Sequence, residues 1–342
     1  MKTIRYIILS IILGIALFAQ TEKKTDEKKS SFYGYVRTYY VSDLESSSEF
    51  VIKHARFGFK GDYNSRVSYK ILAEAANFGN LSVSKDEDGN VTNVKTKFSE
   101  ILLDAFAKIK LSKEFSLTAG QFKIPFSTSS LRTPMSVEFV NRPLISKVNP
   151  DLRDVGLMMD YKHASLPFTL SGSVVNGSGQ NKSEDDNTTN YSFRGVVEPV
   201  NNFEISGNYY SGKISSNEVY IYDFGVNYEF SNLYVDGEYS SRNTSQDLSQ
   251  DVKSNSFFAY AKYGIPVSSE FFEEVAPAVR YEIYDPSDLL SGDKVNKLTV
   301  GLSFYLNKKD YTALKINYEN TDYENNELDS VHSLYALIQV SF

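Results

Sequence analysis

Cysteine is absent from the 342 residues, and histidine occurs only at His54, His163 and His332. Without cysteine the chain has no disulfide framework and no lipoprotein attachment point. The sequence contains no serine hydrolase motif of the Gly-x-Ser-x-Gly type. The turn at Gly89 lacks the spaced ligands of a calcium-binding loop, and the paired acids Asp185 and Asp186 lie in a polar stretch. We therefore expect no enzyme, no metal site and no cofactor.

Long apolar runs are also missing after the first 19 residues. Residues 1–6 contain Lys2 and Arg5, residues 7–19 are mostly apolar, and Ala19 offers a small cleavage residue. This run is shorter than the roughly 20 residues that a spanning helix needs, so it predicts a secretory signal peptide. Residues 20–31 are charged and aperiodic, which predicts a disordered periplasmic lead-in. Residues 32–342 then form a single domain.

The charge balance excludes a further class of partner. Removal of Lys2 and Arg5 with the signal peptide changes the net charge from −7 to −9, and an acidic chain of this kind does not suit nucleic acid. Tryptophan is absent, yet there are 25 tyrosines and 23 phenylalanines. Aromatic residues in such numbers favour strands and membrane interfaces.

Apolar and polar residues alternate from Phe32 to the last residue, and no helical apolar stripe is present. Leu298, Val300 and Leu302, for example, share one face of a strand whose other face carries Thr299 and Gly301. The alternation predicts sixteen strands: 32–41, 51–61, 65–77, 100–111, 114–122, 152–163, 167–176, 190–198, 202–210, 218–230, 233–241, 253–263, 271–284, 295–306, 311–320 and 332–342.

The lengths of the connections alternate as well. Those after even-numbered strands are mostly tight turns, whereas those after odd-numbered strands, such as 42–50, 79–99, 177–189 and 285–294, are longer and polar. Short turns at one end and long loops at the other are typical of an outer-membrane β-barrel. A soluble β-sandwich also alternates, but it fits neither the signal peptide nor a charged second face. The prediction is an all-β, transmembrane antiparallel barrel of about 16 strands in a Gram-negative-type outer membrane.

Several segments of the first half resemble the phosphate-selective porin O and P family. They are ARFGFKGDYNSRVSYKILAE (55–74), LLDAFAKIKLSKEFSLTAGQFKIPFS (102–127), FVNRP (139–143), RDVGLMM (153–159), VVNGSG (174–179) and FRGVVEP (193–199). The resemblance implies a sixteen-stranded barrel, often a homotrimer, whose third long loop folds into the lumen and whose arginines and lysines lead anions through. The final strand ends in Phe342, which looks like the signal that the barrel-assembly machinery reads in outer-membrane barrels.

Residues 123–150 form the long loop that we expect inside the lumen, because a loop lying along lipid would leave backbone groups unpaired. The basic candidates for pore constriction and anion contact are Lys123, Arg132, Arg142 and Lys147 in this loop, with Arg153, Arg56 and Lys108 beside it. The alternative is that some of them pair with Glu138, Asp151 or Asp154 and pin the loop to the wall.

The face that points into the lumen is predicted to be basic in the first half of the chain and acidic in the second. In the first half it carries Arg37, Arg56, Lys60, Lys70, Lys108, Lys110, Lys162 and Arg194 with Glu74, Asp104, Asp154, Asp160 and Glu198; in the second it carries Glu204, Asp223, Glu229, Asp236, Glu238, Glu282 and Glu319 with Lys262, Arg280 and Lys315.

These features predict a water-filled porin, surrounded by outer-membrane lipid, for passive diffusion of small anionic solutes such as phosphate. The alternative is a general or weakly cation-selective porin for small polar metabolites. A structural or adhesin barrel is disfavoured, because it would need large external loops and the longest of the others here, 79–99, has about 20 residues.

Overall fold

The computed structural model describes residues 29–44, 47–76, 81–85, 91–96, 101–150, 152–182, 188–214, 216–245, 250–325 and 327–342. The signal peptide predicted for residues 1–19 lies outside the described residues, as does most of the lead-in predicted for residues 20–31. The first strand begins at Lys29, so the last three residues of that lead-in are already part of the sheet.

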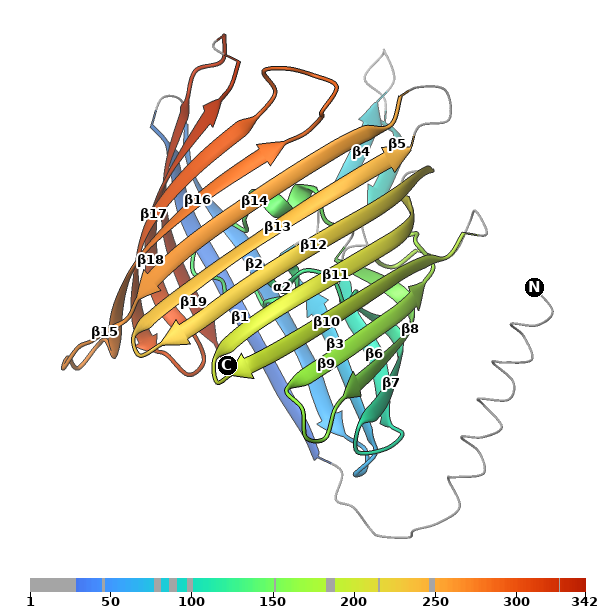
Figure 1. Ribbon diagram of the computed structural model, residues 1–342. Helices are drawn as coiled ribbons and strands as arrows, with labels where there is room; N and C mark the ends of the chain where they lie inside the picture. Colours follow the sequence, from blue (N-terminus) through green and yellow to red (C-terminus); the bar gives the residue numbers. More distant parts are fainter. Residues whose placement is uncertain are drawn as a thin grey trace.

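One closed antiparallel sheet makes up the fold, and its strands follow one another in chain order (Figure 1). The first half of the wall consists of β1 (Lys29–Asp43), β2 (Ser48–Asp62), β3 (Val67–Glu74), β6 (Leu102–Lys110), β7 (Phe115–Lys123), β8 (Arg153–Lys162), β9 (Phe168–Val175) and β10 (Asn190–Val200).

The second half of the wall continues in the same order. It consists of β11 (Phe203–Ile214), β12 (Asn217–Phe230), β13 (Leu233–Ser245), β14 (Val252–Tyr263), β16 (Glu274–Asp285), β17 (Val295–Asn307), β18 (Thr312–Tyr323) and β19 (Val331–Ser341). A two-residue strand, β15 (Ile265–Pro266), extends the pairing of β14 with β16 and is not counted as a separate strand of the barrel.

The barrel closes where β1 pairs with β19, for example at Arg37 opposite Gln339. Closure gives each strand of the barrel wall two neighbours, so the wall has no open edge of unpaired backbone groups, which is the condition for a sheet in hydrocarbon. The predicted barrel of sixteen antiparallel strands is thereby confirmed, and the soluble sandwich is excluded.

The two faces of each strand differ as the alternation predicts. On β12, Tyr222 and Phe224 are exposed, whereas Ile221 and Asp223 on the other face are fully buried. Apolar residues thus point outward and most polar residues point into the barrel. Predicted inward residues that the structure buries are Arg37, Glu74, Asp104, Asp154, Asp223, Asp236, Glu238, Arg280, Glu282, Lys315 and Glu319.

The connections follow the predicted asymmetry with three corrections. β11 extends to Ile214 and β12 begins at Asn217, so the seven-residue loop expected at 211–217 is largely replaced by strand. The strand predicted from residue 271 begins only at Glu274, so the connection predicted for 264–270 is longer and contains β15. The predicted loop 79–99 contains a hairpin of β4 (Leu81–Lys85) and β5 (Val91–Thr96).

Helix is scarce. In the described ranges the two short helices, α2 (Thr128–Leu131) and the 3-10 helix η2 (Leu144–Lys147), lie between β7 and β8. Among the described residues, no helix is long and apolar enough to cross a membrane.

Candidate functional site

Residues 124–150, called here the β7–β8 segment, begin and end in an apolar cluster. Ile124 and Phe126 from its start and Val148 from its end pack with Val175 on β9 and Ile221 on β12, all nearly fully buried. Burial of each large apolar side chain contributes about 1.5 to 3 kcal/mol. The two ends of the segment are therefore fixed to one side of the barrel wall.

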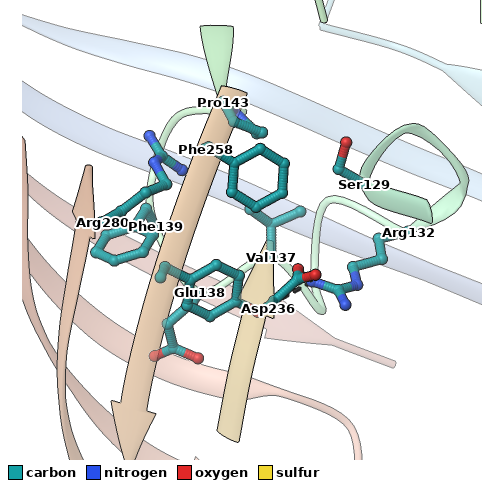
Figure 2. Close-up of a pocket in the computed structure, with 10 residues that line it drawn as sticks. Ser129, Arg132, Val137, Glu138, Phe139, Pro143, Asp236, Phe258 and Arg280 are labelled. Carbon is teal, nitrogen blue, oxygen red and sulfur yellow. Dashed lines mark hydrogen bonds and ion pairs between the residues drawn. The ribbon is translucent and has the colours of Figure 1, made fainter. Parts of the chain in front are cut away.

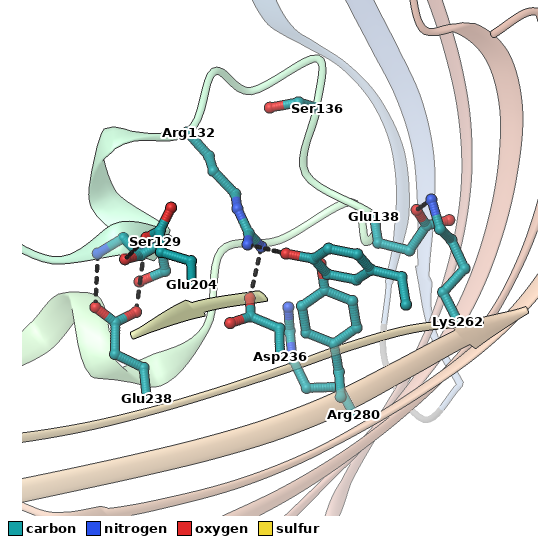
Figure 3. A network of polar contacts seen from close by, with 12 residues as sticks. Ser129, Arg132, Ser136, Glu138, Glu204, Asp236, Glu238, Lys262 and Arg280 are labelled. Carbon is teal, nitrogen blue, oxygen red and sulfur yellow. Dashed lines mark hydrogen bonds and ion pairs between the residues drawn. The ribbon is translucent and has the colours of Figure 1, made fainter. Parts of the chain in front are cut away.

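Backbone N–H groups of the segment donate to polar side chains that point inward from distant strands. Glu238 on β13 accepts from Thr128 N at 2.8 Å and from Ser129 N at 3.1 Å (Figure 3). Two further contacts are Val140 N to Asn317 Oδ1 at 2.6 Å and Leu144 N to Glu282 Oε2 at 2.5 Å. Buried N–H groups need such partners, so the acids satisfy the start of α2 and of η2.

Backbone carbonyls of the segment accept hydrogen bonds from inward-pointing cations. These are Lys315 Nζ to Val137 O at 2.8 Å, Lys53 Nζ to Val140 O at 2.9 Å and Arg280 Nη1 to Asn141 O at 3.0 Å. Hydrogen bonds of charged donors are stronger than neutral ones. Two acids and one amide thus accept from the N–H groups of the segment, whereas basic side chains donate to its carbonyl groups.

Arg132 reaches across to the acidic wall. Its Nη1 lies 2.6 Å from Asp236 Oδ2 and 3.0 Å from the hydroxyl of Tyr260, and its Nη2 donates to the hydroxyl of Tyr234 (Figure 3). Burial alone would lower the pKa of Arg132, but Tyr260 and Asp236 raise it overall. The guanidinium is therefore held in its charged form.

Glu138 is the acidic counterpart in the segment. Its carboxylate accepts from Ser303 Oγ at 2.8 Å and from the Tyr305 hydroxyl at 3.0 Å, and it lies 3.2 Å from Lys262 Nζ. Burial alone would raise the pKa of Glu138, but Lys315 and Lys262 lower it overall. Glu138 therefore fixes the middle of the segment to β14 and β17.

A small cavity of about 20 Å³ separates the segment from the wall near Arg132, Asp236 and Arg280 (Figure 2). The Arg280 guanidinium lies 4.6 Å from the centre of the Phe139 ring, which in turn packs edge-on against Tyr260. A cavity needs about 10 to 15 Å³ for one water molecule, so the segment packs closely on this side of the barrel.

The family model described as phosphate-selective porin O and P matches residues 30–231, more than half of the chain. The chain belongs to the phosphate-selective porin O and P family. Family and closed barrel together make it an outer-membrane porin, a channel of the Gram-negative outer membrane. No curated protein matches it.

Solved porin structures share the fold of this porin at low sequence identity. An anion-selective porin from Comamonas acidovorans has 15% identity and a TM-score of 0.65, covering 92% of this chain and 100% of that one. OmpF of Salmonella typhi in complex with daunomycin has 16% identity and a TM-score of 0.62, covering 94% and 100%. The trimer form of OmpT from Vibrio cholerae has 10% identity and a TM-score of 0.63, covering 93% and 100%.

Two of the basic residues predicted for the constriction of this porin bind the segment itself. Lys123 Nζ donates to the carbonyls of Ser130, Leu131 and Arg132 at 2.8 to 3.2 Å. Arg142 donates to the Ser129 carbonyl at 2.6 Å and to the Arg132 carbonyl at 2.8 Å. Both therefore fold the segment back on itself, whereas Arg132 pins it to β13 and β14.

The other basic residues predicted to contact anions lie on the barrel wall or at the surface of the segment. Three form ion pairs: Arg153 with Asp104 at 2.7 Å, Arg56 with Glu74 at 2.7 Å and Lys108 with Asp160 at 2.8 Å. Lys147 is exposed, with its ammonium 5.2 Å from the centre of the Tyr284 ring. Their contact with anions stays a prediction.

The sequence interpretation did not single out Lys53, Asn317 or the tyrosines that surround the segment. Lys53 falls where the pairing of β1 with β2 shifts register, and such a bulge breaks the alternation used to assign faces. Asn317 and Tyr305 do follow the alternation, so their inward direction was readable. Their contacts with a loop about 170 positions away could not be read from the sequence.

Proposed function

We propose that this porin is a diffusion channel with a weak preference for small anions, such as phosphate. The observation that carries the proposal is a cluster of four arginines at the segment, Arg142 with Arg37, Arg56 and Arg153. Burial and then the proximity of Arg56 lower the pKa of Arg142 to about 10, and Arg153 adds to the effect. Arginines remain charged at neutral pH even so, and together they raise the potential that a passing ion meets.

Carboxylates offset this cluster only in part. The ion pairs of Arg56 and Arg153, within the described part of the chain, are with Glu74 and Asp104. Arg37 donates instead to the neutral Gln339 and Val140 carbonyl oxygens, and Arg142 donates to backbone carbonyls. A hydrogen bond to a carbonyl satisfies the donor without cancelling its charge. The excess of arginine over carboxylate therefore favours anions.

We also propose that the β7–β8 segment narrows the lumen and that selectivity is set there. Its contacts with residues that point inward from β13, β16 and β18 support this placement. The Debye length is about 8 Å at physiological salt, so charges at a wide mouth are screened more than charges beside the ion.

An acidic wall supports the second candidate, a general porin for small polar metabolites. Glu204, Asp223, Asp236 and Glu238 line the neighbouring strands β11 to β13. In the described part of the chain, Asp236 pairs with Arg132 and Glu204 pairs with Arg194. A basic wall that faces an acidic one orients dipolar solutes and weakens net selectivity.

Reversal potentials across bilayers under a potassium chloride gradient, with and without added phosphate, test the assignment. We expect anion preference in the wild type and a smaller preference in Arg142→Gln. Arg142→Lys is the matched control, because it keeps the charge and loses only the forked hydrogen bonds. Cation preference in the wild type would favour the general porin instead.

We further propose a homotrimer, supported by the likeness to a porin described as a trimer form. Crosslinking in native outer membranes, compared with a detergent-dispersed sample, tests it. A product no larger than a monomer in membranes would overturn the trimer and leave the channel assignment intact.

A further inference from the structure

A groove of about 530 Å³ crosses the outer face of the barrel from β7 to β12. These strands are neighbours in the sheet, and β9 to β12 are on the near side of Figure 1. Its lining combines exposed apolar side chains, among them Leu170, Phe193 and Phe224, with the glycines Gly172, Gly195 and Gly207.

The strand register explains the hollow. Leu170 on β9 lies opposite Gly195 on β10, Gly195 opposite Gly207 on β11, and Gly207 opposite Phe224 on β12. In the next row, Gly172 lies between Met159 and Phe193. Outward positions without side chains therefore adjoin one another, and large apolar side chains border them on both sides.

The backbone does not require glycine at these three positions. A Cβ at Gly172, Gly195 or Gly207 would meet its nearest atom at 3.4, 3.5 or 3.8 Å, which is ordinary contact. At Gly58 and Gly156, by contrast, a Cβ would lie 2.1 Å from a carbonyl oxygen. Gly58 and Gly156 are thus needed for close backbone approach, whereas the three groove glycines are not, and their missing side chains leave the outer face low between the large apolar side chains.

The groove slopes from the short-turn end of the barrel toward the middle of the wall. It starts at Phe115, the first residue of β7, opposite Tyr161, and on β12 it reaches Phe224, well before that strand ends at Phe230. The rings of Phe115 and Tyr161 lie 4.7 Å apart, and Phe168 packs against Tyr161 at 5.8 Å. Aromatic clusters at the end of a barrel mark the membrane interface, and short turns mark the periplasmic side.

We propose that this groove holds one acyl chain of a phospholipid from the periplasmic leaflet. The groove is continuous with the apolar band that faces hydrocarbon, and an apolar hollow there is filled by a chain and not by water. Its low end opens at the interface beside the exposed Lys113 of the turn between β6 and β7, a cation suited to a headgroup phosphate. The three glycines make room for the chain as it rises into the hydrocarbon.

Native mass spectrometry of the full-length porin, reconstituted with palmitoyl-oleoyl phosphatidylethanolamine and released from detergent, tests the proposal. We expect one retained phospholipid per barrel in the wild type. Gly195→Val with Gly207→Val fills the groove without backbone strain and should lower occupancy about tenfold, which corresponds to about 1.4 kcal/mol. Ala259→Val, at an exposed outward position on β14, is the matched control and should retain the lipid.

Three results would overturn the proposal. The first is equal retention in the wild type and the double variant. The second is retention of lipopolysaccharide alone when a parallel sample is reconstituted with both lipopolysaccharide and the phospholipid. The third is loss of oligomer in the double variant, which would show that a second copy of the chain covers the groove. Heat-modifiable gel migration verifies that each variant has formed a barrel, and Gly172→Val provides a second substitution if the double variant fails to assemble.

Discussion

Arg132 and Asp236 form an ion pair of 2.6 Å between the β7–β8 segment and β13, with Asp236 almost fully buried. Removal of one member of a buried pair costs about 3 to 5 kcal/mol, because the other charge is left without its partner. Asp236→Asn should therefore loosen the segment, seen as greater open-channel noise in single-channel recordings. Asp160→Asn breaks an inward ion pair with Lys108 away from the segment and is the control. Equal open-channel noise in both variants would show that the Arg132–Asp236 pair does not restrain the segment in the open channel.

Deletion of residues 128–146 tests whether the segment narrows the channel. Replacement of these residues by a short glycine-serine linker keeps the apolar cluster around Ile124 and Val148. We expect a higher single-channel conductance, because the polar wall would then face open water. Unchanged conductance in a barrel that still shows heat-modifiable migration would place the segment outside the conducting path.

The charge of Arg142 predicts a dependence on alkaline pH. Its pKa is lowered to about 10, so the group loses its proton at a lower pH than a free guanidinium. Anion preference should fall as the pH rises through about 10. Lysines and tyrosines titrate in the same range, so reversal potentials of Arg142→Gln provide the baseline. The hypothesis fails if the wild type and the variant change in parallel.

The apolar cluster at the root of the segment should carry much of its stability. Phe126 is 2% exposed and contacts Tyr210 with ring centres 6.2 Å apart. Phe126→Ala should cost about 3 to 5 kcal/mol through lost burial and a cavity. Urea unfolding followed by gel mobility measures the change, and Phe271→Ala, at a residue 72% exposed, should have a small effect.

The end of the chain gives a prediction about assembly. Phe342 packs against Phe32, with ring centres 5.8 Å apart. If the assembly machinery reads the terminal aromatic, Phe342→Ala should slow the appearance of the heat-modifiable form in cells. Phe32→Ala removes the same ring contact and leaves the terminal residue intact. Equal delays in both variants would assign the effect to packing alone.

The barrel was predictable because alternation and loop length are local properties of the sequence. Asp223 and Phe224, for instance, take opposite faces in the sequence pattern and in the structure. Boundaries were less accurate where polar residues continue a strand, as at Gly212 and Lys213 in β11, which the pattern assigned to a loop. The hairpin within 79–99 was missed because its strands have only five and six residues, too few for their alternation to stand out in a polar stretch.

The partners of the basic residues were not predictable from the sequence. Arg142 and Lys123 are positive charges in a long loop, and charge alone suggests an anion contact. Their hydrogen bonds to the carbonyls of Ser129 and Leu131 depend on how the segment turns back, and no periodicity encodes that turn. The sequence analysis did leave open that cations of the loop fix it in place. It named Glu138, Asp151 and Asp154 as their partners, however, whereas Arg142 and Lys123 bind backbone carbonyls.

Pairing of β1 with β19 joins residues 302 positions apart, Arg37 and Gln339, through one of the side-chain contacts at the seam. Until the last strand is available, the first has an open edge on that side, and contacts between such distant residues are slow to form because loop closure must precede them. The half-built sheet is exposed to edge pairing with other chains throughout this interval. Pairing of β1 with β19, and not the pairing of successive strands, should therefore limit the rate of folding. It should also determine how long the chain depends on chaperones in the periplasm.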